Sequence, residues 1–342
     1  MDPSVSPRVP TPDTSHVGLQ KAFPDVYEAA EDSFLFLDAL AEDIRFLLRR
    51  RPALVLEMGS GSGCVISFLR KLFLLRVASS KGLPGETPTG GQTGPERNAR
   101  CSGHPDTAHD SSHSTSSCSS SCSPSPSSSC SFFVPRFLAV DCNLSATAAT
   151  LETARRAERN ERREREGGER PSEGGEAPNR GAIGSASASQ EENENCRGAI
   201  DVLAGDLFGG FRSQSRREPP WSPSSACSPS LGEAQKPGRT VGIFDVILFN
   251  PPYVPGSPRG RPPSPADWAW WGGEDGREVI DRFLPQAIAY LSPSGVLYLL
   301  LEKRNKVDEV VAHIEAQGFA AEQVKRRKIN GEDLSVWRFT RL

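Results

Sequence analysis

The stretch Ala53–Gly63, ALVLEMGSGSG, joins a short apolar run to a loop with three glycines. The run Ala53–Met58 is typical of a buried parallel strand, because both faces of such a strand are covered and its residues are hydrophobic almost without interruption. The residues that follow, Cys64–Leu75, have the apolar content of a helix packed behind that strand. Strand, glycine loop and helix therefore predict one unit of a parallel α/β sheet.

The rest of the chain repeats this alternation outward from the glycine loop. A helical stripe of apolar residues runs through Glu28–Arg50, with Asp32 or Ser33 available as its N-cap. The stripe consists of Phe34, Leu37, Ala41, Ile44 and Leu48. More strands are predicted at Phe132–Val140, Ala199–Ala204, Ile243–Phe249 and Val296–Leu301, and more helices at Ser145–Asn160, Glu278–Leu291 and Lys306–Gln317. Such units build a doubly wound sheet that binds ligands at the carboxyl ends of its strands.

The end of the chain predicts a different kind of pairing. Two strand-like runs, Ala321–Ile329 and Asp333–Thr340, are joined by Asn330-Gly331, a strong signal for a hairpin. The whole chain therefore predicts an α/β fold with a Rossmann-like sheet of seven strands. Most of these strands are parallel, and an antiparallel hairpin closes the sheet at the C-terminus.

Three low-complexity segments interrupt the pattern, at residues 77–131, 161–198 and 212–240. They lack the aliphatic residues needed to offset the entropy lost on ordering, so we interpret them as insertions within one domain spanning residues 1–342. The first insertion contains histidines and cysteines at a zinc-like spacing, namely His109, His113, Cys118 and Cys122. No strand or helix is predicted around them, so we predict no metal site.

Composition excludes several classes of protein. The formal net charge of -3 at pH 7 lacks the basic excess of many nucleic-acid-binding proteins. Most of the eight cysteines lie in or beside low-complexity sequence, which indicates free thiols in a reducing compartment. No apolar run reaches the roughly 18 to 20 residues of a membrane span, and the first residues have no signal-peptide pattern. We expect a cytoplasmic or nuclear protein that does not contact membranes.

Acidic residues mark the ends of the first three predicted strands. With segment 77–131 set aside, Asp141 follows the glycine loop at nearly the spacing, roughly 20 residues, of the ribose-binding acid in dinucleotide folds. Asp206 could accept a hydrogen bond from an adenine amino group beside the Leu207 N–H, although alone it would suggest a helix N-cap. A glycine loop alone also fits an ordinary turn. Together with Glu57, these features favour S-adenosyl-L-methionine over a dinucleotide, because no phosphate-binding lysine is present.

The tetrapeptide Asn250-Pro251-Pro252-Tyr253 follows the predicted strand Ile243–Phe249. The Asn250 side-chain oxygen and the Pro251 carbonyl can each accept one N–H of a planar NH2 group. The two prolines stiffen the loop, and Tyr253 offers a flat face for stacking. A proline-rich turn is the simpler alternative, but the position after a buried strand and a glycine loop favours methyl transfer to an amide or aryl NH2.

At these motifs the chain resembles the HemK-like glutamine methyltransferases, which are class I enzymes with a Rossmann-like fold. The matching stretches are His16-Val17-Gly18, Asp25–Phe34, Leu151–Arg155, Phe249–Val254, Trp271–Phe283 and Leu334–Val336. The most similar branch is the eukaryotic one, which methylates N5 of the glutamine in the Gly-Gly-Gln motif of class 1 peptide chain release factors. The resemblance covers nearly all of the sequence outside the three insertions.

The resemblance also implies which residues act and with what partner. The implied cofactor-binding residues are Ser33, Glu57, Gly59, Gly61, Asp141, Asp206, Leu207 and Asn250, and the residues that hold the target amide are Asn250, Pro251, Pro252 and Tyr253. A small zinc-binding activator subunit is expected to form a heterodimer with the chain. The strand Ala199–Ala204 offers a physical reason, because it should form an apolar edge of the sheet, which invites strand addition.

Two other functions compete with this interpretation. An N6-adenine DNA or RNA methyltransferase uses the same tetrapeptide, but no added nucleic-acid-binding region is apparent. A non-catalytic cofactor-binding scaffold is disfavoured by the intact tetrapeptide, and methylation of lysine on other proteins stays open as a side activity. The basic run Lys325–Lys328 either touches RNA or forms a solvated strand face. Trp268, Trp270 and Trp271 either wall the substrate site or pack beneath it.

Overall fold

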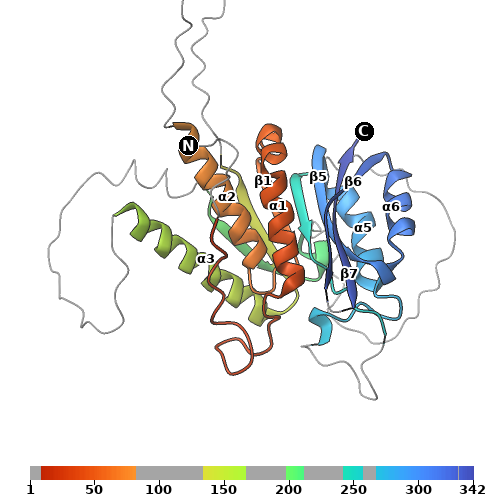
Figure 1. Cartoon of the computed structure of the whole chain (residues 1–342), viewed down its shortest axis with the longest axis horizontal. Helices are drawn as coiled ribbons and strands as arrows, with labels where there is room; N and C mark the ends of the chain where they lie inside the picture. Colours follow the sequence, from red (N-terminus) through yellow and green to blue (C-terminus); the bar gives the residue numbers. More distant parts are fainter. Residues whose placement is uncertain (1–8, 82–133, 167–197, 212–241, 257–266, 330) are drawn as a thin grey trace, which may run out of the picture.

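The computed structural model describes residues 9–81, 134–166, 198–211, 242–256, 267–329 and 331–342. These residues form a sheet with the strand order β3-β2-β1-β4-β5-β7-β6 (Figure 1). The strands are β1 Leu54–Met58, β2 Arg136–Asp141, β3 Ile200–Ala204, β4 Phe244–Phe249, β5 Leu291–Glu302, β6 Phe319–Ile329 and β7 Glu332–Arg341. β1 to β5 run parallel, whereas β7 is antiparallel to both of its neighbours. The predicted fold is confirmed.

Helices cover both faces of the sheet (Figure 1). The α-helices are α1 Glu31–Arg50, α2 Cys64–Lys81, α3 Leu144–Arg165, α5 Glu278–Tyr290 and α6 Val307–Glu315, and short 3-10 turns are η1 Leu207–Phe211, η2 Asp267–Ala269 and η3 Lys303–Asn305. Alternate residues of a strand point to opposite faces, so the core divides into two clusters. One faces α1 and α2, and the other faces α5, α6 and η1. None of the helices that the structure describes combines the length and apolar character of a membrane span.

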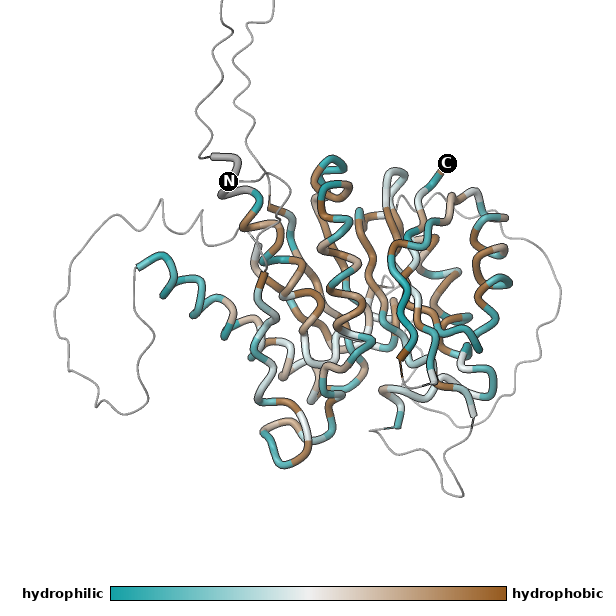
Figure 2. The backbone as a smooth tube through the Cα atoms, viewed as in Figure 1, coloured by the Kyte–Doolittle hydropathy of each residue, from teal (hydrophilic) through white to brown (hydrophobic). Residues whose placement is uncertain are grey.

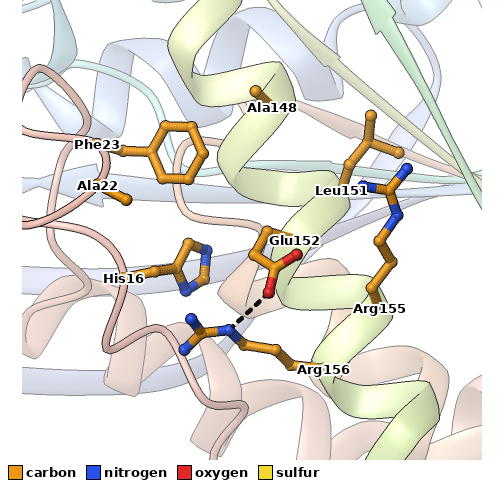
Figure 3. A pocket seen from close by; sticks show the side chains of 8 residues that line it. All are labelled: His16, Ala22, Phe23, Ala148, Leu151, Glu152, Arg155 and Arg156. Carbon is orange, nitrogen blue, oxygen red and sulfur yellow. Dashed lines mark hydrogen bonds and ion pairs between the residues drawn. The ribbon is translucent and has the colours of Figure 1, made fainter.

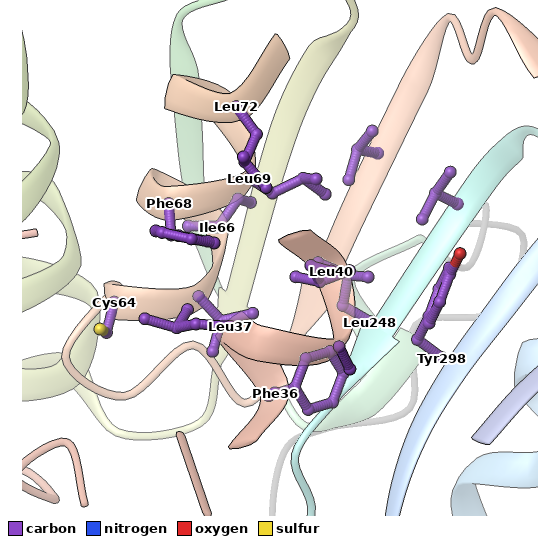
Figure 4. Close-up of a cluster of buried hydrophobic side chains, with 14 of the residues drawn as sticks. Phe36, Leu37, Leu40, Cys64, Ile66, Phe68, Leu69, Leu72, Leu248 and Tyr298 are labelled. Carbon is purple, nitrogen blue, oxygen red and sulfur yellow. The ribbon is translucent and has the colours of Figure 1, made fainter. Parts of the chain in front are cut away.

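The colouring in Figure 2 shows that hydrophobic residues are concentrated along the central strands and in the helices beside them. In the cluster on the α1 side, Leu40 of α1 and Leu69 of α2 pack toward the strands, from which Leu248 points back (Figure 4). All three side chains are fully buried. This packing fixes α1 against the sheet, and the N-terminal turn of α1 reaches the carboxyl ends of the strands.

The start of α1 differs from the prediction. The N-cap residue is Ala30, and its side chain makes no capping hydrogen bond. Asp32 and Ser33, the predicted caps, instead lie buried inside the first turn of the helix. Phe34, expected in the buried stripe, is 36% exposed. Asp32 does not cap the helix because its carboxylate accepts hydrogen bonds from the side chains of Tyr27 and Asn250.

The boundaries of the insertions also differ from the prediction. α2 continues to Lys81 and α3 to Arg165, so each helix extends beyond the predicted start of an insertion at residue 77 or 161. Glu161 is only 5% exposed, because its Oε1 accepts a hydrogen bond of 2.7 Å from Nη1 of Arg70, which is also buried. The remainder of the three predicted insertions lies almost entirely outside the described residues.

The Arg70–Glu161 pair should contribute strongly to the free energy of unfolding. Removing one partner of a buried ion pair leaves the other charge without compensation, so Arg70→Met should lower this free energy by about 3–5 kcal/mol. The exposed pair Arg136–Asp201, with side chains 72% and 58% exposed, provides the control. Arg136→Met should cost less than about 1 kcal/mol. Urea denaturation measures both changes, and equal losses would contradict the assigned role of the buried pair.

Candidate active site

The predicted site residues converge at the carboxyl ends of the parallel strands. β3, β2, β1 and β4 are adjacent and parallel, so their carboxyl ends meet there. The glycine loop follows β1, Asp141 ends β2, Asp206 follows β3 and Asn250 follows β4. The N-terminal turn of α1 joins them through a contact between Asp32 and Asn250. Residues far apart in the sequence thus form one constellation.

Backbone conformation explains the glycines after β1. Gly59, Gly61 and Gly63 all have positive φ, at 64°, 52° and 74°. A Cβ at Gly63 would lie 2.8 Å from the Thr150 Cα, so α3 can approach the loop only because this residue has no side chain. At Gly61, a Cβ would meet none of the described atoms within 4 Å. The loop is therefore closed against α3 and open on the side of Gly61.

Two acidic residues brace the loop. Asp141 Oδ2 accepts a hydrogen bond of 2.9 Å from the Gly61 N–H, and its Oδ1 accepts one of 2.8 Å from the Asn143 N–H. Glu57 is 2% exposed, and its Oε2 accepts a hydrogen bond of 3.1 Å from the Ile66 N–H in α2. Both carboxylates therefore contact the backbone that a nucleotide-like cofactor would approach.

Burial dominates the electrostatics of these two groups. Desolvation raises the pKa of Glu57 well above its ordinary value, and the nearby charge of Asp141 raises it further. Burial also raises the pKa of Asp141, although hydrogen bonds from Asn143 and Gly61 oppose the change. Neither carboxylate has an ion-pair partner among the described residues. Their charged forms therefore reduce the stability of the free protein, which is typical of functional sites.

Asp206 and Leu207 lie at the far end of the row of strands. The Asp206 side chain is 65% exposed, and its Oδ2 accepts a hydrogen bond of 2.5 Å from Nη2 of Arg282 in α5. Leu207 is buried and has a φ of 49°, a conformation that a non-glycine residue rarely adopts. The backbone turns sharply here, so the Asp206 carboxylate stays at the surface while the Leu207 side chain enters the core.

The Asn250 side chain is the most informative group of the site. Its Nδ2 donates a hydrogen bond of 2.8 Å to Oδ2 of Asp32. Because a carboxylate can only accept, this bond fixes the orientation of the amide and directs the carbonyl oxygen elsewhere. Asn250 Oδ1 is buried and has no hydrogen-bond partner among the described residues. A buried acceptor without a partner is costly, so its presence points to a donor supplied by a ligand.

Two tyrosines and a second acid surround this group. The Tyr27 hydroxyl donates to Asp32 Oδ1 at 3.1 Å, and the Tyr253 hydroxyl donates to Oε2 of Glu332 at 3.2 Å. Desolvation and the neighbouring carboxylates raise the pKa of both phenols, so both remain protonated donors. The sequence had assigned no role to Tyr27 or Glu332 and had suggested for Asp32 only the role of a helix cap. An acidic residue such as Asp32, in the first turn of a helix, carries no local signal of its tertiary contacts.

The chain beyond Tyr253 is held by the segment after η2. The Val254 N–H donates to the Trp270 carbonyl at 2.9 Å, and the Gly272 N–H donates to the Val254 carbonyl at 3.0 Å. A Cβ at Gly272 would lie 2.5 Å from the Pro252 oxygen, so only glycine allows this approach. Trp271 donates from Nε1 to the Gly256 carbonyl. Trp270 and Trp271 therefore support the loop.

Trp268 behaves differently from the other two tryptophans. Its side chain is 60% exposed, whereas Trp270 and Trp271 are half-buried. It lies in η2, directly before the residues that support the Asn250–Tyr253 loop. Trp271 therefore fits the interpretation that the tryptophans pack beneath the site. The exposed Trp268 does not pack there, and a role in walling the substrate site stays a prediction for it.

A surface pocket of about 430 Å³ lies elsewhere, between the N-terminal segment and α3 (Figure 3). It contains none of the predicted site residues and is lined by His16, Ala22, Phe23, Ala148, Leu151, Glu152, Arg155 and Arg156. His16 is buried, and its Nε2 lies 3.0 Å from the Ala149 carbonyl and 3.2 Å from the Thr153 hydroxyl. These contacts dock the N-terminal segment on α3 and explain the sequence match at His16.

The basic run on β6 is neutralised within the protein. Lys325 pairs with Glu42, Arg326 with Asp333, and Arg327 with Asp38 and Glu31. Cations that are already paired offer little attraction to phosphates. The structure therefore favours the solvated strand face over an RNA contact. The histidines and cysteines of the zinc-like pattern lie outside the described residues.

Comparisons with known proteins show what the chain is similar to. No protein-family model matches the chain. Methyltransferase HEMK2 of Mus musculus is 27% identical over 98% of this chain and 99% of its own length. The eRF1 methyltransferase catalytic subunit mtq2 of Schizosaccharomyces pombe is 25% identical over 97% of this chain and 96% of its own. A putative protein N5-glutamine methyltransferase of Methanocaldococcus jannaschii is 40% identical over 29% of this chain and 51% of its own.

The sheet order, with its antiparallel C-terminal strands, is that of the class I methyltransferase fold, in which ligands bind at the carboxyl ends of the parallel strands. The similarity to the mouse and fission yeast proteins extends over nearly the whole chain. Over nearly its whole length the chain is therefore similar to HemK-like methyltransferases of the eukaryotic type, in agreement with the resemblance seen in the sequence.

Glu57 should make the stability of the free protein depend on pH. The folded protein holds the Glu57 proton more tightly than the unfolded chain, for which the ordinary pKa is 4.5. The free energy of unfolding should therefore fall as pH rises from 4.5 through the raised pKa of the folded state. Glu57→Gln should weaken this dependence and raise stability at neutral pH, with a residual slope from Asp141.

Urea denaturation between about pH 5 and pH 8 tests this, because that interval includes the range in which a raised carboxyl pKa acts. The control is Glu315→Gln, an exposed residue of α6, which should leave the slope unchanged. The wild-type free energy of unfolding could instead rise with pH over this range, or its pH dependence could be the same in Glu57→Gln. Either result would show that the Glu57 carboxyl does not dominate the pH dependence of stability.

Proposed function

We propose that the chain transfers the methyl group of S-adenosyl-L-methionine to N5 of the glutamine in a Gly-Gly-Gln motif, and that the substrate is a class 1 peptide chain release factor. The observation that carries this proposal is the unpartnered, buried Asn250 Oδ1, with its orientation fixed by Asp32. A primary amide presents an N–H that satisfies this acceptor. The relatives support the substrate, since one is named as an eRF1 methyltransferase and another as an N5-glutamine methyltransferase.

Several features fit the proposed cofactor. The loop is open beside Gly61, and carboxylates rather than cations surround it, which suits a ligand without phosphates. In the proposed site, Asp141 binds the ribose hydroxyls and Asp206 with Leu207 binds the adenine. Ser33, Glu57, Gly59 and Gly61 complete the contacts with the rest of the cofactor. When bound, this cofactor supplies an electrophilic methyl group on a positively charged sulfur.

The residues of the chain act on the amide nitrogen. Its lone pair is delocalised into the carbonyl, so the nitrogen must be held while it moves toward tetrahedral geometry. Asn250 Oδ1 accepts one N–H, and the Pro251 carbonyl accepts the other. Both acceptors stabilise the positive charge that develops on nitrogen. Tyr253 packs beside the planar group, and the prolines keep the two acceptors in place.

The proposed function predicts where a methyl label appears. The chain, co-expressed with the small zinc-binding activator, should label a release factor and should not label its variant in which the Gly-Gly-Gln glutamine is alanine. DNA should stay unlabelled, consistent with the paired cations of β6. Label on DNA would support an adenine methyltransferase instead. Undiminished label on the alanine variant would indicate another acceptor, such as lysine.

Asp32 should be required for the orientation of Asn250. In Asp32→Asn the new side chain can donate as well as accept, so the Asn250 amide is free to turn and present its NH2 to the substrate. The kcat for the release factor should fall about 10- to 100-fold, in the range expected for a misplaced reacting group. Asp38→Asn on the same helix is the control, since Asp38 is 52% exposed and contacts Arg327. A kcat equal to that of this control would contradict the role of Asp32.

The sheet edge suits the proposed activator. β3 is an edge strand, and its Leu203 is 43% exposed, so a strand of a partner can pair with β3 and cover this side chain. The fission yeast relative is named as a catalytic subunit, which implies a further subunit in that protein. We therefore propose that the chain works as a heterodimer, in the cytoplasm where its substrate acts.

Leu203→Lys should weaken the heterodimer without unfolding the chain, because it places a charge on the apolar edge. Co-purification of the tagged chain with the activator measures the effect. Leu342→Lys is the matched control, since Leu342 is 91% exposed at the end of the chain and lies after β7 rather than at β3. Retention of the activator by Leu203→Lys at the level of the control would place the interface elsewhere.

A further inference from the structure

One fully buried asparagine, Asn305, contacts the Asn250–Tyr253 loop from outside the motif. It ends η3, which follows β5, and its side chain is 0% exposed. Nδ2 donates to the Tyr253 carbonyl at 2.8 Å and to the carbonyls of Asp275 and Gly276, each at 3.2 Å. Oδ1 accepts a hydrogen bond of 2.8 Å from the Glu302 N–H. Every polar atom of this side chain is thus used.

The chemistry of these contacts requires an amide. Three carbonyl oxygens converge on Nδ2, which only a donor can satisfy, while the Glu302 N–H requires an acceptor at the other end of the same short side chain. Aspartate would present an oxygen to the three carbonyls. Serine could reach one of them. The position therefore demands asparagine for its hydrogen bonds and not merely for its volume.

The two loops that Asn305 joins are in close contact. Gly276 has a φ of 69°, and a Cβ there would lie 2.1 Å from the Tyr253 oxygen. This proximity brings the Tyr253 and Gly276 carbonyls close together, and their dipoles would repel each other without a donor between them. The Asn305 NH2 group lies between the carbonyls, and its two N–H bonds are shared among the three of them. It therefore permits the segment before α5 to press against the loop that follows β4.

Tyr253 is consequently held at both ends. Its carbonyl accepts from Asn305, and its hydroxyl donates to Glu332 at 3.2 Å. Glu302, which is 2% exposed, links the two anchors, because its carboxylate accepts hydrogen bonds from the backbone N–H groups of Arg304 and Asp333. The position of the tetrapeptide is therefore set from the end of β5 and the start of β7.

We propose that Asn305 is a positioning residue for methyl transfer: its amide fixes the Tyr253 carbonyl and thereby the Asn250 and Pro251 acceptors that hold the substrate. This inference rests on the proposed function and adds a residue that does not touch the substrate. The cofactor loop follows β1, and none of the hydrogen bonds of the Asn305 side chain reaches it. Loss of the amide therefore lowers the rate of methyl transfer and not the affinity for the cofactor.

The test uses Asn305→Asp and the milder Asn305→Ser, each in the full chain co-expressed with the activator. Both should lower kcat for the release factor, Asn305→Asp by about 100-fold, the loss expected for a displacement of about 1 Å at a reacting group. The Kd for S-adenosyl-L-homocysteine, measured by calorimetry, should change less than about twofold, which corresponds to under about 0.4 kcal/mol. Hydrogen exchange at Val254 and Gly256 should accelerate in both variants.

Tyr298→Phe separates positioning from general stability. Tyr298 is fully buried on β5, and its hydroxyl bonds to Asp43 of α1, away from the tetrapeptide. This control should lower Tm while kcat stays unchanged. The inference is overturned if Asn305→Ser keeps the kcat of Tyr298→Phe, or if cofactor affinity falls in parallel with kcat. A wild-type chain that leaves the release factor unmethylated refutes the proposed function instead, and hydrogen exchange still reports whether Asn305 holds the loop.

Discussion

The hydrogen bond from Asn250 Nδ2 to Asp32 gives direction to the whole site. It joins the first turn of α1 to the end of β4, two elements separated by most of the chain. For this bond to form, α1 must pack on the sheet with its N-terminal turn at the carboxyl ends of the strands, which the cluster around Leu40 and Leu69 ensures. The core thus determines which way the Asn250 amide points, and the unpartnered lone pairs of its buried oxygen define what can bind.

The site also retains energetically unfavourable groups. Glu57 and Asp141 are buried carboxylates whose pKa values are raised by desolvation, and Asn250 Oδ1 is a buried acceptor without a protein partner. Each reduces the stability of the free protein, and each can be satisfied by donors on a ligand. Ligand binding should therefore stabilise the folded protein, because the ligand supplies the hydrogen bonds that folding leaves incomplete.

Local pattern was sufficient for the fold, since apolar runs, glycine loops and the Asn-Gly turn each report their own element. It also indicated Asp141, Asp206 and Asn250 as candidates, because polar residues at the ends of successive predicted strands are harder to explain by local structure than any one of them alone. Asp32 and Glu161 were misjudged for one reason: an acid in a helix looks like a cap or a solvated charge unless its distant partner is known. Their partners, Asn250 and Arg70, are supplied only by tertiary packing.

The two long helices after β1 and β2 have one end near the site and one far from it. α2 and α3 each begin beside the carboxyl ends of the strands and return the chain toward their amino ends. The proposed methyl-transfer site lies at the carboxyl ends. A substitution in the last turn of α3 is thus separated from Asp32, Asn250 and Asp141 by the height of the sheet, so the outer end of this helix can change without altering the distances on which the chemistry depends.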